Sequence, residues 1–342
     1  MSKNYILQDE NSVYFECGYS CDNEIFLHIR GRNFLLTDSR YAIEARNLAH
    51  DTEVIEIKQP IIKEARLLLR KFGVKSLVFD PYDFSYAQFE ELSKFIHINF
   101  IPRPFFSKKK RMIKSQKEIE ILKQAAIFGA KSFDQFAKFV SENGLSLSEK
   151  ELFFHACNIL KHDGELGLSF EPIIALNQNA AKAHALPSSD RLRSGDLLLL
   201  DAGVKFKRYC SDRTRTACFT DSVEFSKRQS FKTQKQNEIY QIVKEAQNLA
   251  IKAVKPGVLA RDVDNAAREF ITKCGYKKEF FHSTGHGVGI DIHEFPNINS
   301  KSEVVLKEGM VFSVEPGIYL EGEFGVRIED VVVVTADGCE IL

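Results

Sequence analysis

Acidic and imidazole side chains occur late in the chain, in segments that otherwise have the character of buried strands. They are Asp201 after LLLL, Asp212 in YCSDRTRT, His286 in HSTGHGVG, Glu315 in FSVEPG and Glu329 in VRIED. An ionised carboxylate that leaves water is destabilised unless it is paired or bound to a metal ion. For a single Asp or Glu, a surface charge or a structural ion pair is the commoner explanation. The joint occurrence of these residues in apolar surroundings indicates a metal centre instead.

The spacing of the carboxylates divides them into two pairs. Asp201 and Asp212 are eleven residues apart, and Glu315 and Glu329 are fourteen apart. A strand–turn–strand hairpin would bring each pair side by side, the second with its turn at residues 322–325. Two divalent cations balance the charge of four carboxylates, and a histidine adds a nitrogen ligand. Such an oxygen-rich set suits Mn²⁺, Co²⁺ or Zn²⁺ as a pair about 3.5–4 Å apart.

Arginines close to these carboxylates in sequence could form structural ion pairs with them, which is an alternative to metal binding. Arg213, Arg215 and Arg327 are all candidates to pair with them. Because alternate residues of a strand share a face, we expect Arg327 to lie beside Glu329, where the two can form a structural ion pair. Tyr319 and Arg327 are both candidates to orient a ligand, and spacing does not rank them.

Further histidines surround the proposed centre in glycine- or proline-punctuated segments. His282 is four residues before His286, His293 is seven after it, and His184 lies in NAAKAHALP. A lone histidine is more often structural, but several near a metal centre indicate proton transfer or hydrogen bonding to substrate. The sequence GHGVG is not GxGxxG and no helix is expected after it, so no dinucleotide site is implied.

The first 111 residues are expected to form a small α/β domain. The patterns predict a hairpin with Gly31 in its turn, a helix over 41–50, a strand over 74–80 and a helix over 89–96. The segment 101–111 contains two prolines and a run of basic residues. We interpret it as a linker whose charges are solvated.

Residues 112–342 repeat one plan, in which two helices precede a group of strands. Ser115 with Glu118 and Ser148 with Glu151 are capping boxes that begin the first two helices. The second of these helices is expected to end at Gly164. Later helices are predicted over 233–254 and 260–274, with strands over 169–219 and 281–339. The fold class is therefore α+β, with two related halves facing each other across one sheet and a site at their seam.

Composition narrows the classes of function. The chain has 342 residues, with 47 Lys and Arg and 47 Asp and Glu, so its formal net charge is zero. This balance argues against a nucleic-acid partner held by phosphate contacts. The longest apolar runs have four residues, far short of the roughly 20 that a membrane helix needs. The first ten residues do not resemble a secretory signal, and seven irregularly spaced cysteines favour reduced thiols in the cytoplasm.

The five ligand motifs resemble those of the "pita-bread" metallopeptidases, which include methionine aminopeptidase, aminopeptidase P, prolidase and creatinase. The resemblance covers 112–342 and implies a dinuclear metal centre, with Mn²⁺ the first expectation and Co²⁺ or Zn²⁺ the alternatives. By this resemblance Asp212 and Glu329 bridge the ions, Asp201 binds one ion, and His286 and Glu315 bind the other. Glu315 would also handle the proton of the attacking water.

Within this family the proline-specific branch is the most similar. His282, His293 and His184 match its substrate-side histidines, and Arg327 matches an arginine of that branch. The resemblance implies catalytic roles for His184, His293, Glu315 and Arg327, and substrate binding by His282 and His293.

The expected activity is that of a Xaa-Pro aminopeptidase acting on a peptide with proline at its second position. The first domain resembles a creatinase-type N-terminal domain, which favours aminopeptidase P, and a homodimer is expected from the resemblance. One alternative is a prolidase that cleaves only Xaa-Pro dipeptides. Another is a metal-free, peptide- or protein-binding pseudoenzyme.

Overall fold

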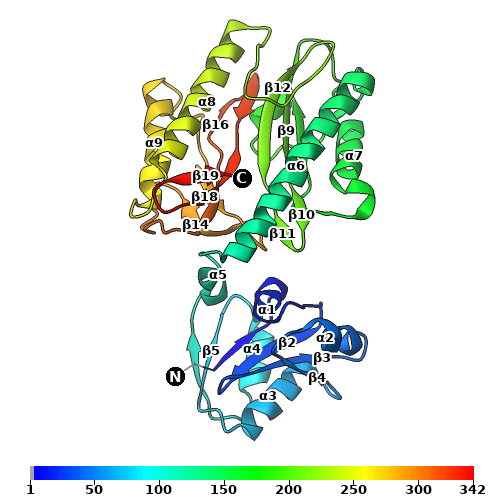
Figure 1. The fold of residues 1–342 in the computed structure, drawn as a ribbon, viewed down its shortest axis with the longest axis vertical. Helices are drawn as coiled ribbons and strands as arrows, with labels where there is room; N and C mark the ends of the chain where they lie inside the picture. The colour runs from blue at the N-terminus through cyan, green and yellow to red at the C-terminus, as the bar shows by residue number, and fades with distance from the viewer. Residues whose placement is uncertain (1–3) are drawn as a thin grey trace. The chain divides into compact units, whose positions relative to one another are not determined.

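The computed structural model describes residues 4–342. Contacts divide the chain into two compact units, Met1–Arg111 and Met112–Leu342 (Figure 1). Each unit has its own buried apolar core. Among the described residues, no helix is long and apolar enough to cross a membrane.

The first unit is built on a six-stranded sheet in the order β4-β3-β2-β1-β5-β6. Its strands are β1 (Tyr5–Leu7), β2 (Glu24–Ile29), β3 (Arg32–Thr37), β4 (Glu53–Glu56), β5 (Ser76–Phe79) and β6 (Asn99–Pro102). Its helices are α1 (Glu10–Cys17), α2 (Ala42–Leu48), α3 (Ile61–Lys71), α4 (Tyr86–Ser93) and α5 (Phe106–Lys110). Strand β2 pairs antiparallel with both β1 and β3. The other pairs, β3 with β4, β1 with β5 and β5 with β6, are parallel.

The structure confirms the predicted hairpin and corrects two other expectations for this unit. Gly31 adopts φ +81° between β2 and β3, a conformation that glycine reaches without strain. Helix α4 begins three residues earlier than expected because Ser85 and Gln88 form a capping box. The expected linker is wrong: it contains the second half of β6 and all of α5. Arg111 is only 1% exposed, since its guanidinium contacts the hydroxyl of Ser12 at 3.3 Å and the carboxylate of Asp9 at 4.0 Å.

Two helix pairs cover the strands of the second unit. They are α6 (Gln116–Asn143) with α7 (Glu149–Leu160), and α8 (Gln234–Ala253) with α9 (Ala260–Lys273). The capping boxes predicted at Ser115 and Ser148 are both formed. The end of α7 lies four residues before the expected Gly164, because His162 and Asp163 take left-handed backbone conformations that an α-helix does not accommodate.

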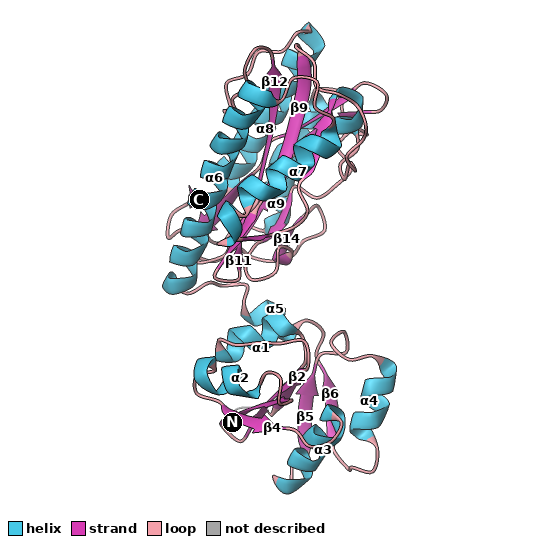
Figure 2. Cartoon of the chain, turned by 90° about the vertical axis from the view of Figure 1, so that its right-hand side faces the viewer, coloured by secondary structure: helices cyan, strands magenta, loops and turns pink. Residues whose placement is uncertain are grey.

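The strands of the second unit fall into separate sheets. The first half contains β7 (Gly167–Leu168), β8 (Ile173–Leu176), β9 (Asp196–Ala202), β10 (Val204–Phe206), β11 (Tyr209–Cys210) and β12 (Arg213–Phe219). The second half contains β13 (Gly285–Gly287), β14 (Glu294–Ile298), β15 (Val311–Val314), β16 (Gly317–Leu320), β17 (Phe324–Arg327), β18 (Asp330–Val334) and β19 (Cys339–Ile341). The main sheets have the orders β12-β9-β8 and β14-β13-β15-β18-β19. Figure 2 shows these strands between the helices of the unit.

The expected single sheet across both halves is therefore wrong. Where β12 meets β17, the Thr216 hydroxyl lies 3.0 Å from the carbonyl oxygen of Arg327 and 3.2 Å from its backbone N–H. A side chain thus replaces the backbone partner that a continuous ladder would require. A direct backbone bond, from Glu329 N–H to the carbonyl of Thr214 at 3.1 Å, also holds the seam where the candidate site lies.

Candidate metal centre

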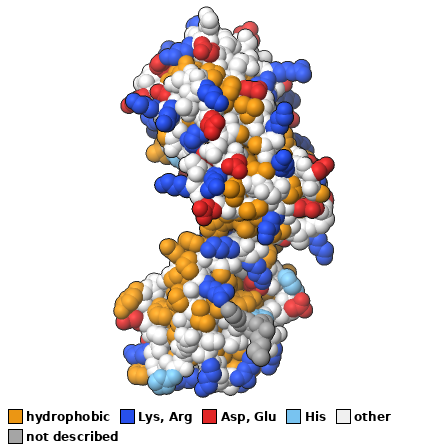
Figure 3. Space-filling view, turned by 90° about the vertical axis from the view of Figure 1, so that its left-hand side faces the viewer, with side chains coloured by type: hydrophobic (Ala, Val, Ile, Leu, Met, Phe, Trp, Pro, Cys, Tyr) orange, Lys and Arg blue, Asp and Glu red, His pale blue; other side chains and the backbone are white. Residues whose placement is uncertain are grey.

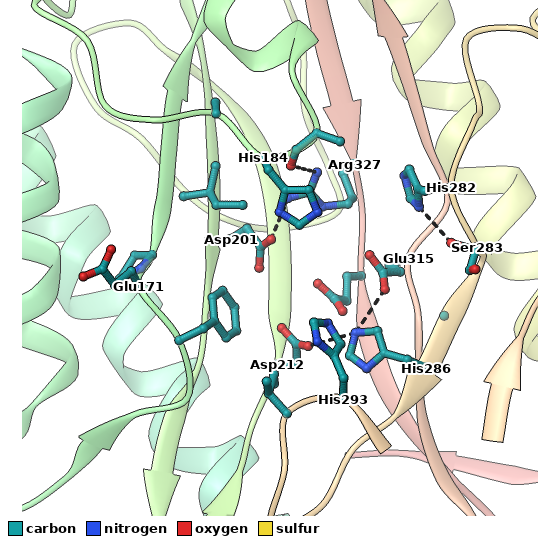
Figure 4. Close-up of a pocket in the computed structure, with 18 of the residues that line it drawn as sticks. Glu171, His184, Asp201, Asp212, His282, Ser283, His286, His293, Glu315 and Arg327 are labelled. Carbon is teal, nitrogen blue, oxygen red and sulfur yellow. Dashed lines mark hydrogen bonds and ion pairs between the residues drawn. The ribbon is translucent and has the colours of Figure 1, made fainter. Parts of the chain in front are cut away.

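The five side chains predicted as ligands all line one cavity of about 770 Å³ in the second unit. Figure 4 shows Asp201, Asp212, His286 and Glu315 converging on this cavity from strands of both halves. The same cavity is lined by the four further residues that the sequence singled out, namely His184, His282, His293 and Arg327.

The first carboxylate pair comes from the neighbouring strands β9 and β12. Asp201 is in β9, where it is in register with Thr214, and Asp212 immediately precedes β12. The connection is not a simple turn, because β10 and β11 form a second small hairpin between the two strands. Both carboxylates are buried, each residue being 8% exposed.

The second pair comes from the strands β15 and β18. Val314 is in register with Asp330. Glu315 directly follows Val314 and Glu329 directly precedes Asp330, so the two glutamates lie side by side. The β16–β17 hairpin separates them along the chain, and Phe324 and the residue after it belong to β17 rather than to the expected turn.

His286 lies in β13, and glycines on both sides of it allow its strand to approach its neighbours closely. A Cβ atom at Gly285 would lie 1.8 Å from the carbonyl oxygen of Ser313, an impossible contact. The His286 ring places Nδ1 3.1 Å from the carbonyl oxygen of Gly287. A proton on Nδ1 can therefore be donated to this carbonyl, which leaves the Nε2 lone pair for a metal ion. Nε2 lies 3.3 Å from Glu315 Oε1 and 3.6 Å from Asp212 Oδ2.

The electrostatics of the site fit bound cations. Burial, and then the charge of Glu329, raise the pKa of Asp212 well above its usual range. Burial, and then the charges of Glu315 and Asp201, do the same to the pKa of Glu329. Atoms of Asp212, His286 and Glu329 lie within 4.8 Å of one another. The buried Asp201 Oδ1 has no hydrogen-bond partner among the described residues. These residues form an oxygen-rich donor set with an unsatisfied buried acceptor, which suits hard or borderline divalent metals.

The pKa shifts of Glu315 and His286, by contrast, both favour the charged form of the side chain. Burial alone would raise the pKa of Glu315, but hydrogen bonding to His286 and its charge outweigh burial and lower that pKa. Burial likewise opposes ionisation of His286, yet hydrogen bonding to Glu315 and its charge raise the pKa of the imidazole. Ser313 also donates to Glu315 Oε1 at 3.1 Å. These two candidate ligands thus stabilise each other in their charged forms.

The expected ion pair between Arg327 and Glu329 is wrong. The Arg327 guanidinium instead donates to Asp201 Oδ2 at 2.6 Å and to the Tyr319 hydroxyl at 2.8 Å. Burial lowers the pKa of Arg327, but the charges of Tyr319 and Asp201 outweigh it and raise that pKa. Arg215 pairs with Asp330 rather than with a predicted ligand.

The three additional histidines occupy different parts of the cavity wall. The His282 ring places Nε2 2.9 Å from the Tyr319 hydroxyl, and burial lowers its pKa. The exposed His293 packs edge-on against His286, with 4.2 Å between ring centroids. His184 is exposed and lies close to Arg327 in the view of Figure 4.

Sequence reasoning missed residues that hold the ligands in place. Thr214 donates to Glu329 Oε2 at 2.6 Å, and Ser313 contacts both Glu315 and the backbone N–H of His286. Each lies one or two residues from a predicted ligand on a strand. A polar residue in an otherwise apolar strand beside a ligand is the signal that could have identified them.

Comparison with known proteins establishes the family. Residues 120–336 match the model of metallopeptidase family M24. The chain therefore belongs to this metallopeptidase family, and its relatives place it in the proline-specific branch. The fold and the arrangement of the candidate site agree with this assignment.

Several proteins that are similar to this chain in sequence or structure are named as Xaa-Pro peptidases. A Xaa-Pro dipeptidase of Pyrococcus furiosus is 40% identical over 232 residues, which cover 68% of this chain and 63% of the relative. The structure of a Xaa-Pro dipeptidase from Bacillus anthracis superposes with a TM-score of 0.91 at 33% identity, covering 99% of this chain and 92% of the other. An X-Pro aminopeptidase from Thermotoga maritima superposes with a TM-score of 0.88 at 32% identity, covering 99% and 94%.

Proposed function

We propose that this chain hydrolyses the peptide bond between an amino-terminal residue and proline, using a pair of divalent metal ions. The observation that carries the proposal is the convergence of four carboxylates and the Nε2 atom of His286 in one cavity. Two such ions, when bound, lower the pKa of a shared water and polarise the scissile carbonyl. Mn²⁺ is the first expectation for the metal, with Co²⁺ and Zn²⁺ as alternatives.

The metal ligands in this proposal are Asp201, Asp212, His286, Glu315 and Glu329. Asp212 and Glu329 have raised pKa values when no cation is present, and bound cations would favour their ionised forms. Glu315, whose pKa is lowered, is the carboxylate best suited to be ionised at neutral pH. It can therefore accept a proton from the attacking water and deliver it to the leaving nitrogen.

The remaining polar residues of the cavity act on the substrate. His184 and His293 would donate hydrogen bonds to the oxygen on which charge develops. His282 and His293 line the pocket for the proline ring, and Arg327 holds Asp201 and Tyr319 in place. Apolar neighbours such as Ile292 and Phe170 line the same cavity, which suits a pyrrolidine ring that offers no N–H for recognition.

We propose that the preferred substrate is a Xaa-Pro dipeptide, because the Pyrococcus furiosus and Bacillus anthracis relatives are Xaa-Pro dipeptidases. The second candidate is the aminopeptidase activity on longer peptides, which the Thermotoga maritima structure supports. A homodimer remains our expectation for the assembly, and light scattering in solution would test it.

The experiment compares Ala-Pro, Ala-Pro-Ala and Ala-Ala-Ala as substrates after chelation and addition of Mn²⁺, Co²⁺ or Zn²⁺. We expect metal-dependent release of alanine from the proline peptides, fastest from Ala-Pro, and loss of this activity in Asp212→Asn. Faster cleavage of Ala-Pro-Ala would favour the aminopeptidase. A folded chain that binds no metal would support the pseudoenzyme instead.

A further inference from the structure

A buried carboxylate on α9 holds the segment that carries two of the site's histidines. Asp264 is 0% exposed. Its Oδ1 accepts hydrogen bonds from the hydroxyl of Thr284 at 2.7 Å and from its backbone N–H at 3.2 Å. Arg268, one turn further along α9, contacts both carboxylate oxygens, with Nε 2.7 Å from Oδ2 and Nη2 2.8 Å from Oδ1. The sequence pattern presents Asp264 as an ordinary helix charge, yet the structure buries it.

The guanidinium of Arg268 extends these contacts to the backbone of the same segment. Nη1 donates to the carbonyl of Phe280 at 3.1 Å, and Nη2 donates to the carbonyl of His282 at 2.7 Å. The guanidinium carbon also lies 4.2 Å from the centre of the Phe280 ring. A planar guanidinium with several fixed donors can bind two carbonyls and a carboxylate at once. A lysine ammonium has no such fixed arrangement of donors.

Thr284 passes this restraint on to a metal ligand. Its carbonyl accepts a hydrogen bond from the backbone N–H of Glu315 at 2.8 Å. Two residues later, the backbone N–H of His286 donates to the Ser313 hydroxyl at 3.1 Å, and that hydroxyl contacts Glu315. The position of Thr284 is therefore coupled to the separation between His286 and Glu315.

We propose that Asp264, Arg268 and Thr284 form a clamp on residues 280–286 that sets the positions of His286 and Glu315 for metal binding. The clamp consists of positioning residues, and its benefit to catalysis rests on the function proposed above. Helix α9 also packs through apolar side chains such as Val263 and Ile271, both fully buried. The helix can therefore stay in place when a single polar contact of the clamp is removed.

The test compares Thr284→Val with Thr284→Ser by calorimetric titration of the metal-free protein with Mn²⁺ alone. Valine has nearly the shape of threonine and keeps the backbone N–H bond to Asp264, but its side chain cannot donate, whereas serine keeps the hydroxyl. We expect Thr284→Val to bind Mn²⁺ about 10–100-fold more weakly, the range found for groups that orient metal ligands. Thr284→Ser should bind within about threefold of the wild type.

A second pair of variants covers the case in which Thr284→Val does not fold. Arg268 is partly exposed, so we expect Arg268→Met to fold, to bind Mn²⁺ more weakly and to raise the KM for Ala-Pro, because His282 loses its carbonyl contact. Lys273→Met is the matched control on the same helix, since Lys273 has a side chain 77% exposed. It should leave both quantities unchanged.

The outcomes separate the clamp from the proposed function. Unchanged Mn²⁺ affinity in folded Thr284→Val, or unchanged affinity in Arg268→Met, would overturn the clamp whatever the activity. A wild-type chain that binds Mn²⁺ but cleaves no Xaa-Pro peptide would overturn the proposed function. The Mn²⁺ affinities of the variants would still test the clamp. A wild-type chain that binds no Mn²⁺ would overturn the clamp as a device for metal binding.

Discussion

The guanidinium of Arg327 joins the carboxylate of Asp201 to the hydroxyl of Tyr319, at 2.6 Å and 2.8 Å. Because arginine can only donate, the Tyr319 oxygen accepts from it and directs its own hydrogen to Nε2 of His282, 2.9 Å away. The other ring nitrogen of His282 can then donate to the carbonyl of Ser283 at 2.8 Å. A metal-ligand candidate and a substrate-side histidine are thus connected through one hydrogen-bonded chain, which fixes the tautomer of the histidine.

Removing the hydroxyl from this chain tests its importance for substrate binding. A neutral hydrogen bond contributes about 0.5–1.5 kcal/mol, so we expect Tyr319→Phe to lower kcat/KM for Ala-Pro by about three- to tenfold. The loss should appear mainly in KM, because His282 is proposed to bind the substrate and the candidate metal ligands are unchanged. Steady-state kinetics would measure it. The control is Tyr240→Phe in α8, which removes a hydroxyl bond to the carbonyl of Ser226 outside the cavity lining. Equal effects of the two variants would contradict the prediction.

A buried ion pair anchors the loop that carries His293. Lys114 Nζ lies 2.9 Å from Glu294 Oε2, and both side chains are 1% exposed. Glu294 also accepts from the backbone N–H of Asp291 at 3.1 Å. Removing one member of a buried ion pair costs about 3–5 kcal/mol. We expect Lys114→Met to lower the free energy of unfolding by this amount, measured by urea unfolding followed by circular dichroism.

The surface pair between Lys123 and Glu340 provides a matched comparison. Its atoms are also 2.9 Å apart, but the side chains are 29% and 50% exposed. Exposed pairs contribute about 0–1 kcal/mol, so Lys123→Met should change stability by less than Lys114→Met. Similar losses in the two variants would show that burial is not the deciding factor.

Local hydrogen bonds explain which parts of the fold could be predicted from the sequence. The capping boxes at Ser115 and Ser148 join residues three positions apart, so their helix starts could be predicted from the residue types alone. The bond between Thr216 and Arg327 spans 111 residues, and no local pattern contains it. For the same reason the sequence did not reveal that side-chain bonds and a backbone bond, rather than a continuous sheet, join the two halves.

Long-range pairing also limited the prediction of the site. Residue type and strand context were enough to nominate the five ligand candidates, which the structure brings to one cavity. The partner of Arg327 was not predictable, because Arg327 pairs with Asp201, 126 positions away, rather than with Glu329, which is close in sequence. Burial was equally hidden at Asp264 in α9 and at Arg111 just after α5, because a charged residue has the same local pattern whether it faces solvent or a distant partner.

Metal binding should stabilise the chain measurably. Mn²⁺ at about 100 times its dissociation constant would add about 2.7 kcal/mol per site, which raises the unfolding temperature of a unit of this size by roughly 5–10 °C. Differential scanning calorimetry with chelator and then with Mn²⁺ would measure the shift. We expect Asp212→Asn to lose most of it. If the unfolding temperature of the wild-type chain did not change with Mn²⁺, Co²⁺ or Zn²⁺, this result would contradict the proposed metal centre.

The space-filling view in Figure 3 shows acidic and basic side chains interspersed on the face drawn. In the first unit, by contrast, some acidic side chains gather below the surface. The carboxylate of Asp83 has a buried oxygen without a hydrogen-bond partner among the described residues. Burial, and then the charges of Asp80 and Asp9, raise the pKa of Asp83 from 3.8 to about 7.

This raised pKa predicts how stability depends on pH. A carboxyl whose pKa is higher in the folded than in the unfolded chain binds its proton more tightly when folded. Its contribution to stability is therefore full below pH 4 and is lost as the pH rises towards 7. Asparagine carries no such charge, so Asp83→Asn should be more stable than the wild type at pH 8. After allowance for partial exposure, we expect about 2 kcal/mol there and almost no difference near pH 4. Urea unfolding of both proteins at pH 4.5 and pH 8 would measure the gap, and an equal gap at both pH values would show that Asp83 does not titrate in this range.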